Sequence, residues 1–412
     1  MRILTFSAYF TPEIAASMYL SEDIFEAMAK EGHFVDLYVP TPCRGISNEV
    51  RKQYKRKKTE VKYDGHLIIH RFRLYKEGKN TLLRALRYAF LVLKFFWFGL
   101  KQKTDAIFVQ STPPVQGMMA GLLASVKKVP LIYNLQDIFP DSLVNSGMTQ
   151  SGSLIWKIGR WVENFSYKRT SRFIVISDDF KRNIIEKGVS PDKITVVPNW
   201  ADTSSVYPVV RENNKLIDKY HLNPSDFMVV YSGNIGFSQN IDLLLDVAKA
   251  LAARYNQLKF VLIGDGAAKK HIEERIKNEK AKNVVLIPFQ PYEDIAHVFS
   301  LGDAGLIISK PGVGDSSVPS KTWSIMAAGK PVLASFDLNS ELCNLIESVG
   351  CGVCASAGNA DDLIRAIEFL MNNNKEFGIN GYEYVKNNRS SSVCLPKYIK
   401  AIEDAVESAN KM

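Results

Sequence analysis

The segment Val318–Val332 places a cation at the start of a short predicted helix. Ser320 stands where an N-cap residue belongs, Lys321 follows on the first turn, and Gly329 ends the helix before a buried strand. A helix N-terminus presents unpaired N–H groups and the positive end of a dipole, which favour an anion. A lysine there opposes the dipole unless a negative group compensates for it. The pattern predicts a phosphate site; the alternative is a solvent-facing lysine on an ordinary capped helix.

Two further loops could complete such a site. The segment Ser232–Phe237 contains Gly233 and Gly236 and is expected to join a strand to a helix, so that its backbone amides could approach a diphosphate. The loop Lys310–Ser317 is small and polar and leads into Ser320. A plain turn would also explain the first loop. The chain lacks G-x-x-x-x-G-K-[ST], and G-x-G-x-x-G does not follow its first strand, which disfavours NTPases, kinases and nicotinamide or flavin dehydrogenases.

A pair of carboxylates follows another predicted strand, in Asn134–Asp141. Asp137 at the strand end could position or deprotonate a hydroxyl group. The alternative is helix capping by Asp137 and a surface role for Asp141. The six histidines are dispersed, no cluster has metal-ligand spacing, and no G-x-S-x-G is present. We therefore predict no metal site and no serine or cysteine nucleophile.

Short β-branched runs alternate with amphipathic helices along the chain, which predicts parallel sheets with crossover helices. A polar stretch from Asn199 to Asp226 interrupts the alternation. We expect an α/β protein of two doubly wound, Rossmann-like domains facing across a cleft: residues 1–205, residues 206–390, and a C-terminal helix in 391–412 that returns to the first domain. The expected strands are the runs 3–6, 35–39, 67–72, 106–109, 131–133, 173–176, 194–197, 227–231, 260–263, 284–287, 304–308, 332–334 and 352–354.

Positive charge is concentrated near the N-terminal end of the chain. Residues 44–103 hold 17 Lys and Arg against 4 Asp and Glu, whereas the net charge of the 412-residue chain is +9. The aromatic segment 82–100 carries Arg84, Arg87 and Lys94, which oppose insertion across a bilayer. We expect a helix lying on an anionic membrane surface, or a core-packed crossover helix beside a solvated basic loop. Nucleic acid is disfavoured because no aromatic-basic sheet motif or zinc spacing occurs.

Five scattered cysteines fit a reducing compartment, and Cys351-x-x-Cys354 is expected to pack in the core. Since Met1–Phe6 reads as a first strand, no leader segment is expected. These features predict a cytoplasmic protein.

In combination, these segments resemble the bacterial retaining glycosyltransferases of GT-B fold, the nucleotide-sugar group called family 4. The resemblance spans almost the whole chain and is closest to transferases of capsule, O-antigen or exopolysaccharide assembly. It is carried by the segments 9–13, 32–35, 136–143, 175–177, 188–189, 193–194, 197–202, 233–236, 262–266, 319–321 and 326–332.

The resemblance implies transfer of a sugar, with retention and without metal or cofactor, from a nucleotide-diphosphate donor to a lipid-linked sugar acceptor. A UDP-linked N-acetylated hexosamine or deoxyhexosamine is the implied donor. Lys321 and Asp137 are the implied catalytic residues. The residues implied to bind the acceptor or a phosphate are Ala16, Ser17 and Gln136. The residues implied to bind the donor are Gly233, Asn234, Gly236, Gln239, Asn240, Phe289, Asp315, Ser316, Ser320 and Ser324.

The chain departs from the family pattern at three places. The family commonly has two glutamates seven residues apart. In this chain the first position falls near Ser316, with Asp315 adjacent, and Ser324 occupies the second. The segment 237–240 stands where the family usually has basic residues in the first donor loop. Gln136 occupies the position of the acceptor-side histidine of many members. Two alternatives therefore remain: a UDP-sugar 2-epimerase of the same fold, and a catalytically impaired homologue that serves as a partner subunit.

Overall fold

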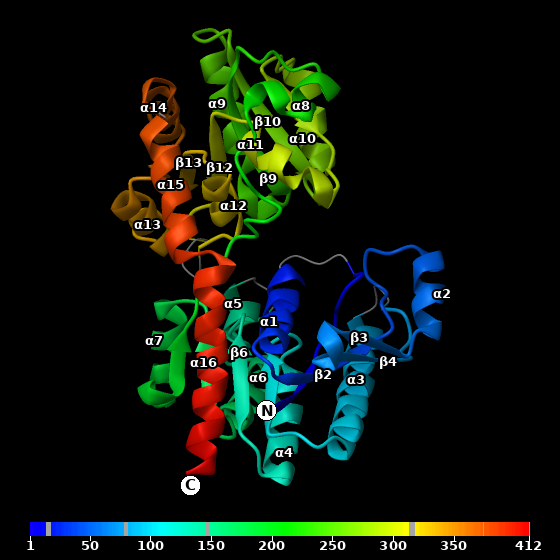
Figure 1. The fold of residues 1–412 in the computed structure, drawn as a ribbon. Coiled ribbons are helices and arrows are strands. Elements are labelled where there is room, and N and C mark those ends of the chain that lie inside the picture. The colour runs from blue at the N-terminus through cyan, green and yellow to red at the C-terminus, as the bar shows by residue number, and fades with distance from the viewer. Residues whose placement is uncertain (14–17, 78–80, 146–148, 313–317, 374, 412) are drawn as a thin grey trace. The chain divides into compact units, whose positions relative to one another are not determined.

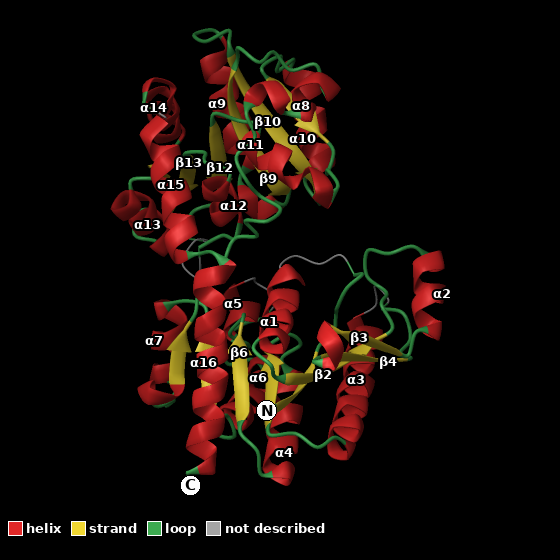
Figure 2. Cartoon of the chain, viewed as in Figure 1, coloured by secondary structure: helices red, strands yellow, loops and turns green. Residues whose placement is uncertain are grey.

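The computed structural model describes residues 1–412 except 14–17, 78–80, 146–148, 313–317, 374 and 412 (Figure 1). The chain forms two compact units, Met1–Asn199 with Cys394–Met412, and Trp200–Val393. Each unit is a sheet covered by helices (Figure 2). The two parallel α/β units predicted from the alternation of strands and helices are confirmed, and each is described separately below.

The first unit contains an eight-stranded sheet of order β3-β4-β2-β1-β5-β6-β7-β8. All neighbouring strands are parallel except β3 and β4. Strand β6 is buried along its whole length, as expected for a parallel strand covered on both faces. The strands are β1 (Arg2–Phe6), β2 (Phe34–Pro40), β3 (Thr59–Lys62), β4 (Leu67–Phe72), β5 (Ala106–Gln110), β6 (Leu131–Leu135), β7 (Arg172–Val175) and β8 (Ile194–Val196).

Helices and short 3-10 turns connect these strands. Helix α4 packs between α3 and α6, and the buried faces of α3 and α4 join the core with Leu91, Phe95 and Leu123. The helical elements are α1 (Met18–Lys30), α2 (Asn48–Arg56), η1 (Tyr63–Gly65), α3 (Thr81–Lys101), α4 (Val115–Lys127), α5 (Asp141–Asn145), α6 (Leu154–Tyr167), α7 (Asp178–Glu186) and η2 (Pro191–Lys193). Most of α16 (Ser391–Asn410) also belongs to this unit.

The basic block contains more regular structure than the sequence suggested. Helix α2, whose N-cap Ser47 accepts a hydrogen bond from the Val50 N–H at 3.3 Å, and the antiparallel edge strand β3 lie where a solvated loop was expected. The sequence did not predict α2 and β3, because the many charged residues leave too few apolar positions for a helix or strand periodicity to be recognised. Helix α3 buries one face on the sheet and exposes the other.

The second unit contains a six-stranded, fully parallel sheet of order β11-β10-β9-β12-β13-β14. Every residue of β12 and β13 is buried. The strands are β9 (Phe227–Asn234), β10 (Leu258–Asp265), β11 (Val284–Ile287), β12 (Ala304–Ile308), β13 (Val332–Phe336) and β14 (Gly352–Ser356).

The helices of this unit pack on both faces of the sheet, where the main apolar clusters lie. They include η3 and α8 within the segment that interrupts the alternation. The helical elements are η3 (Arg211–Asn213), α8 (Lys215–Lys219), η4 (Phe237–Gln239), α9 (Ile241–Ala252), α10 (Lys269–Glu279), η5 (Tyr292–Asp294), α11 (Ile295–Ser300), α12 (Lys321–Ala327), α13 (Glu341–Val349), α14 (Ala360–Asn372) and α15 (Lys375–Asn388).

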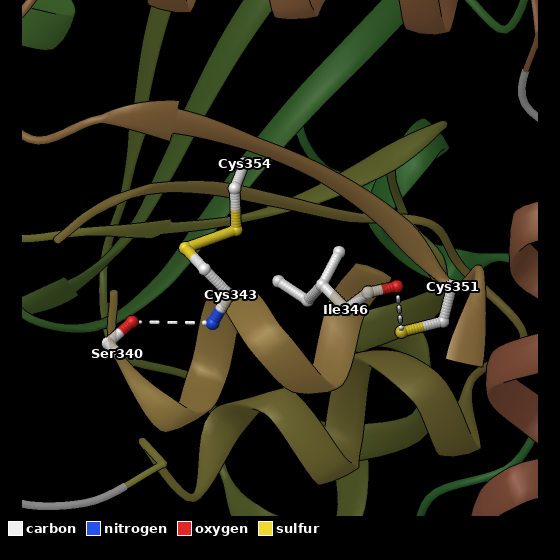
Figure 3. The surroundings of a disulfide bond; sticks show 5 residues. All are labelled: Ser340, Cys343, Ile346, Cys351 and Cys354. Carbon is white, nitrogen blue, oxygen red and sulfur yellow. Dashed lines mark hydrogen bonds between the residues drawn. A yellow bond between two sulfur atoms is a disulfide. The ribbon is translucent and has the colours of Figure 1, made fainter. Parts of the chain in front are cut away.

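The cysteines differ from expectation. Cys354 on β14 forms a disulfide with Cys343 on α13, with their Cα atoms 5.8 Å apart (Figure 3). Cys351 is free and fully buried, so core packing holds for Cys351 but is wrong for Cys354. The turn at Gly350 folds β14 back beside α13, and this brings together two cysteines that are eleven positions apart. A disulfide was not expected either, because the few scattered cysteines suggested a reducing compartment.

Candidate active site

The second sheet reverses its strand order between β9 and β12, because β10 follows β9 on one side and β13 follows β12 on the other. Ligands of open α/β sheets bind beyond the carboxyl ends of the strands at such a point. Gly233 lies at the end of β9, and Lys321 begins the helix that follows β12. The topology therefore brings these two residues to the place where this fold binds ligands.

Lys321 extends its amine toward the end of β9. A Cβ atom added at Gly233 would lie 3.0 Å from the Lys321 Nζ, and the Nζ lies 4.1 Å from the centre of the Tyr231 ring. Among the described residues, no carboxylate forms an ion pair with Lys321. Burial lowers the pKa of this amine to about 8. The Tyr231 ring thus lies against this desolvated cation, and an anionic ligand would complete such an environment.

The turn after β9 is held by its own side chains. The Gly236 N–H donates to the Gln239 Oε1 at 3.1 Å, and the Tyr231 hydroxyl donates to the Asn234 carbonyl at 2.6 Å. Gly233 has a φ of 143°, and a Cβ at Gly264 would lie 1.9 Å from the Gly233 oxygen. The two strand ends therefore approach so closely that only glycine fits at position 264, and this packing shapes the loop beside Lys321.

The predicted donor residues do not all lie together. Gly233, Asn234, Gly236 and Gln239 gather in the turn near Lys321, and the Gln239 side chain is used to hold that turn. Asn240 adopts a left-handed conformation before α9, and Ser324 is half-buried on α12. Phe289 is exposed and follows the edge strand β11. Asp315 and Ser316 lie outside the described residues.

The predicted N-cap role of Ser320 is wrong. Ser320 has helical dihedral angles, φ −57° and ψ −29°, and its side chain makes no capping hydrogen bond. An N-cap needs an extended backbone to direct its oxygen at the following N–H groups. Here the turn begins one residue earlier, where the Thr322 N–H donates to the Pro319 carbonyl at 2.9 Å. The connection from β9 to α9 also differs from the prediction. Strand β9 extends beyond residue 231 to Asn234, and the 3-10 turn η4 precedes the helix.

The predicted acceptor-side residues lie after β6 in the first unit. Ser111, at the end of β5, accepts hydrogen bonds from the N–H groups of Gln136 and Asp137, both at 3.1 Å. Asp137 is exposed as a residue, yet packing around its carboxyl raises the pKa, while a hydrogen bond from Ser142 opposes the rise. A small cavity beside Asp137 is also lined by Tyr133. These contacts orient the loop that carries Asp137.

Gln136 is engaged with neighbours of its own unit. Its Oε1 accepts a hydrogen bond from the Asn199 amide at 2.9 Å, and its Nε2 lies 3.2 Å from the Asn134 Oδ1 and 3.4 Å from the Tyr398 hydroxyl. The side chain therefore joins β6 to α16 and to Asn199. Ala16 and Ser17, the other predicted residues of this group, lie outside the described residues.

Asp141 has a structural role that the sequence did not reveal. Its carboxylate pairs with Lys187 at 2.7 Å, and Lys187 also pairs with the buried Glu163 at 2.8 Å. This network joins α5, α6 and the end of α7. Sequence reasoning also missed Tyr231, because the contact of its ring with Lys321 depends on tertiary packing. Across the described residues, no group of three His, Cys, Asp or Glu side chains could hold a metal ion.

Comparison with known families identifies both halves of the chain. The family described as "Glycosyl transferase 4-like domain" matches residues 19–200, and "Glycosyl transferases group 1" matches residues 212–408. The chain is a two-domain glycosyltransferase. The first match lies in the unit that carries Asp137, and the second includes the whole turn from Gly233 to Gln239 and the helix with Lys321.

Similar proteins extend over most of this glycosyltransferase. WcaI of Escherichia coli, described as a colanic acid biosynthesis glycosyl transferase, is 24% identical and aligns with 89% of this chain and 91% of its own length. The E. coli UDP-Gal:alpha-D-GlcNAc-diphosphoundecaprenol alpha-1,3-galactosyltransferase is 22% identical over 69% of this chain and 73% of its own. The structure of Anabaena HepE in complex with UDP has a TM-score of 0.70 at 15% identity, with full coverage of both chains. The GT-B fold is thereby confirmed.

The Lys321 environment predicts a stability difference that depends on pH. The folded pKa of about 8 lies below the usual value of 10.5, so the unfolded chain binds more protons between these limits. Charge burial should destabilise the protein fully below pH 8, and less as pH rises toward 10.5. Lys321→Met should therefore raise the free energy of unfolding below pH 8, by at most about 3 kcal/mol. The gain should shrink as pH rises from 8 to 10.5.

Denaturant unfolding of the wild type and the variant at several pH values measures this effect. The exposed Lys277 on α10 provides a matched control, Lys277→Met, which should change stability little at any pH. A constant difference between wild type and Lys321→Met across this pH range would contradict the proposed environment.

Proposed function

We propose that this glycosyltransferase moves a sugar from a nucleotide-diphosphate donor to a lipid-linked oligosaccharide, with retention of configuration, in the synthesis of a bacterial cell-surface polysaccharide. We further propose that the donor is UDP-linked and carries an N-acetylated hexosamine or deoxyhexosamine. The polysaccharide role is supported by the similarity to WcaI. The donor and acceptor classes are supported by the name of the related galactosyltransferase and by the UDP complex of HepE.

The observation that carries the proposal is the desolvated amine of Lys321 beside Gly233, which forms no ion pair with any described residue. A cation in a poorly hydrated site interacts with a phosphate far more strongly than a solvated lysine does. Because Gly233 has no side chain, a diphosphate could approach the backbone of the turn and the Lys321 Nζ together. We assign the diphosphate of the donor to this position.

Lys321 would act on the leaving group. When the bond between the sugar and the phosphate oxygen breaks, positive charge develops on the sugar carbon and negative charge on the departing diphosphate. A fixed cation at that diphosphate stabilises the transition state more than the ground state, which is the condition for catalysis. A neighbouring diphosphate should also raise the pKa of Lys321, so that the bound amine is fully charged at neutral pH.

Asp137 is the proposed acceptor-side residue. Its N–H is fixed on the Ser111 hydroxyl, and its carboxylate stands at the carboxyl end of β6. The raised pKa of this carboxyl makes it a better proton acceptor than an ordinary aspartate. We propose that it orients the attacking hydroxyl of the acceptor sugar.

We also propose that the first unit binds the inner face of the cell membrane through the outer face of α3. Six large apolar side chains on this helix are 39–64% exposed, and their spacing of three and four residues places them on one stripe: Leu83, Leu86, Phe90, Leu93, Trp97 and Leu100. We call these six residues the apolar stripe. No helix among the described residues is long and apolar enough to cross a bilayer.

Charge and neighbouring helices favour an anionic bilayer as the partner of the stripe. Helices α3 and α4 contain no Asp or Glu, and the single acid of α6, Glu163, is buried. Helix α4 packs between the other two, and both α4 and α6 expose further apolar residues: Leu122, Val126, Leu154, Ile155, Ile158 and Trp161. Apolar side chains flanked by lysine and arginine suit the boundary of acyl chains and anionic headgroups.

Binding of UDP should depend on pH through Lys321. With a free pKa of about 8, the affinity should be nearly constant between pH 7 and 8 and fall about tenfold per unit above that pKa, because the neutral amine no longer attracts the diphosphate. Lys321→Met should bind UDP weakly and without this decline. The same variant should lose about 100- to 1000-fold in transfer rate, as for removal of one stabilising donor.

Calorimetric titration with UDP and assay of transfer from a panel of UDP-, GDP- and dTDP-sugars measure both effects, with Lys277→Met as the control. Full transfer activity in Lys321→Met would refute the assignment. Interconversion of a UDP-sugar without any acceptor would identify a 2-epimerase instead. UDP binding without turnover on any donor would identify a non-catalytic partner subunit.

Membrane binding is tested by removing apolar area from the stripe. The double variant Leu93→Ser with Trp97→Ser should lower the partition coefficient on phosphatidylglycerol-containing vesicles at least tenfold, because two exposed side chains, at 64% and 59%, lose their apolar contacts. Sedimentation with vesicles gives the measurement. The pair Phe369→Ser with Ile379→Ser, exposed on the second unit, should bind as the wild type does. Unchanged binding of the stripe variant would disprove this surface.

A further inference from the structure

A second basic feature, a surface cavity of about 710 Å³, lies in the first unit between α2 and the segment that follows β4. Its volume is in the range of small-molecule sites. Five cations and one acid, Glu49, line it together with Thr41, Leu74 and Tyr75. The cations are Arg51, Lys52, Lys55, Arg73 and Lys76. Neither the proposed donor site nor the proposed acceptor residue uses this cavity.

Within the part of the chain that the structure describes, the five cations lack carboxylate partners, whereas their neighbours have them. Lys57 and Arg71 both pair with Glu60. No described residue forms an ion pair with any of the five lining the cavity. Lys52 and Lys55 stand three positions apart on α2, where like charges repel each other. An anion that enters the cavity would relieve this repulsion and supply the missing partner.

One wall of the cavity is rigid. Arg51 is only 8% exposed, and its guanidinium donates to the carbonyl of Pro42 at 2.6 Å and to that of Leu74 at 3.0 Å. These bonds use neutral carbonyl oxygens, so the charge of Arg51 stays uncompensated while α2 is fixed against the segment after β4. Arg51 therefore fixes the backbone of α2, which also carries the exposed Lys52 and Lys55, against the segment after β4.

The cavity is continuous with the apolar stripe. Tyr75 lines the cavity, its ring contacts Phe90 edge-on at 6.3 Å between ring centres, and its hydroxyl donates to the Leu83 carbonyl at 3.4 Å. Lys94 of α3 donates to the carbonyl of Arg73 at 2.8 Å. Helices α2 and α3 lie on the same side of the first unit (Figure 1). A basic hollow next to a hydrocarbon-binding surface matches a molecule that joins a phosphate to a hydrocarbon chain.

We propose that this cavity binds the phosphate of a lipid phosphate ester whose hydrocarbon chain lies along the apolar stripe. The phosphate could come from the diphosphate of a lipid-linked acceptor or from a headgroup of the bilayer. The first source rests on the proposed function, whereas the second does not. Either source supplies an anion for the five cations and an apolar chain for α3.

The test compares two double variants that each remove two positive charges from the same segment. Lys52→Ala with Lys55→Ala changes the cavity lining, and Arg56→Ala with Lys58→Ala, also exposed, does not. One probe is geranyl diphosphate, with excess UDP present to fill the candidate active site. The other is a phosphatidylcholine vesicle with or without phosphatidylglycerol.

The cavity variant should bind at least one probe about tenfold more weakly than the control pair does. A loss confined to geranyl diphosphate identifies the acceptor diphosphate, and a loss confined to anionic vesicles identifies bilayer headgroups. Equal losses in the two variants, or none, would overturn the proposal and reduce the cavity to general surface charge. UDP binding should be the same in both variants, so failure of the Lys321 assignment would appear separately.

Discussion

The positive charge of Lys321 in a poorly hydrated position is the constraint on which the second unit depends. A desolvated ammonium destabilises the fold when no carboxylate pairs with it, and none does among the described residues, so the surrounding structure must hold Lys321 in place. The sheet supplies that structure. Because the strand order reverses between β9 and β12, the end of β9 and the helix after β12 meet, and the lysine points across the gap toward Gly233. An arrangement that costs stability without a ligand and gains it with an anion is characteristic of a binding site.

The glycines around Lys321 follow from the same geometry. Any side chain at Gly264 would collide with the Gly233 carbonyl, and one at Gly236 would meet the Gln239 Oε1 at 2.6 Å. Removing side chains from the strand ends lets the backbone of the turn come near the lysine, and the Gly236 N–H bond to Gln239 fixes its course. The proposed phosphate site would depend on the backbone shape of this turn and on one cation, and not on an acidic side chain at position 324.

Strand patterns were the most predictable part of the chain, because a buried parallel strand is a run of β-branched and aliphatic residues whatever surrounds it. Each expected run is a strand, and the α/β class is confirmed. Features set by tertiary contact were not predictable. Ser320 fails as a cap because the turn starts at Pro319, Cys354 pairs with Cys343 because β14 folds back along α13, and α2 and β3 are hidden by charge. The nearness of Lys321 to Gly233 followed from topology, whereas the Tyr231 ring depended on packing. The roles assigned to these residues remain predictions.

The two groups of basic residues differ in a way that suits different ligands. Lys321 is one cation in a confined site, where a low local dielectric makes its attraction short-ranged and nearly insensitive to salt. The cavity beside α2 gathers five cations over a wide, solvated surface, where each contributes little and screening by salt is strong. A confined charge is suited to one leaving group that must be stabilised at a defined position. A broad basic surface is suited to a ligand that is already concentrated at a membrane, because there the proposed contact of the apolar stripe would supply much of the affinity and charge would only have to select the headgroup.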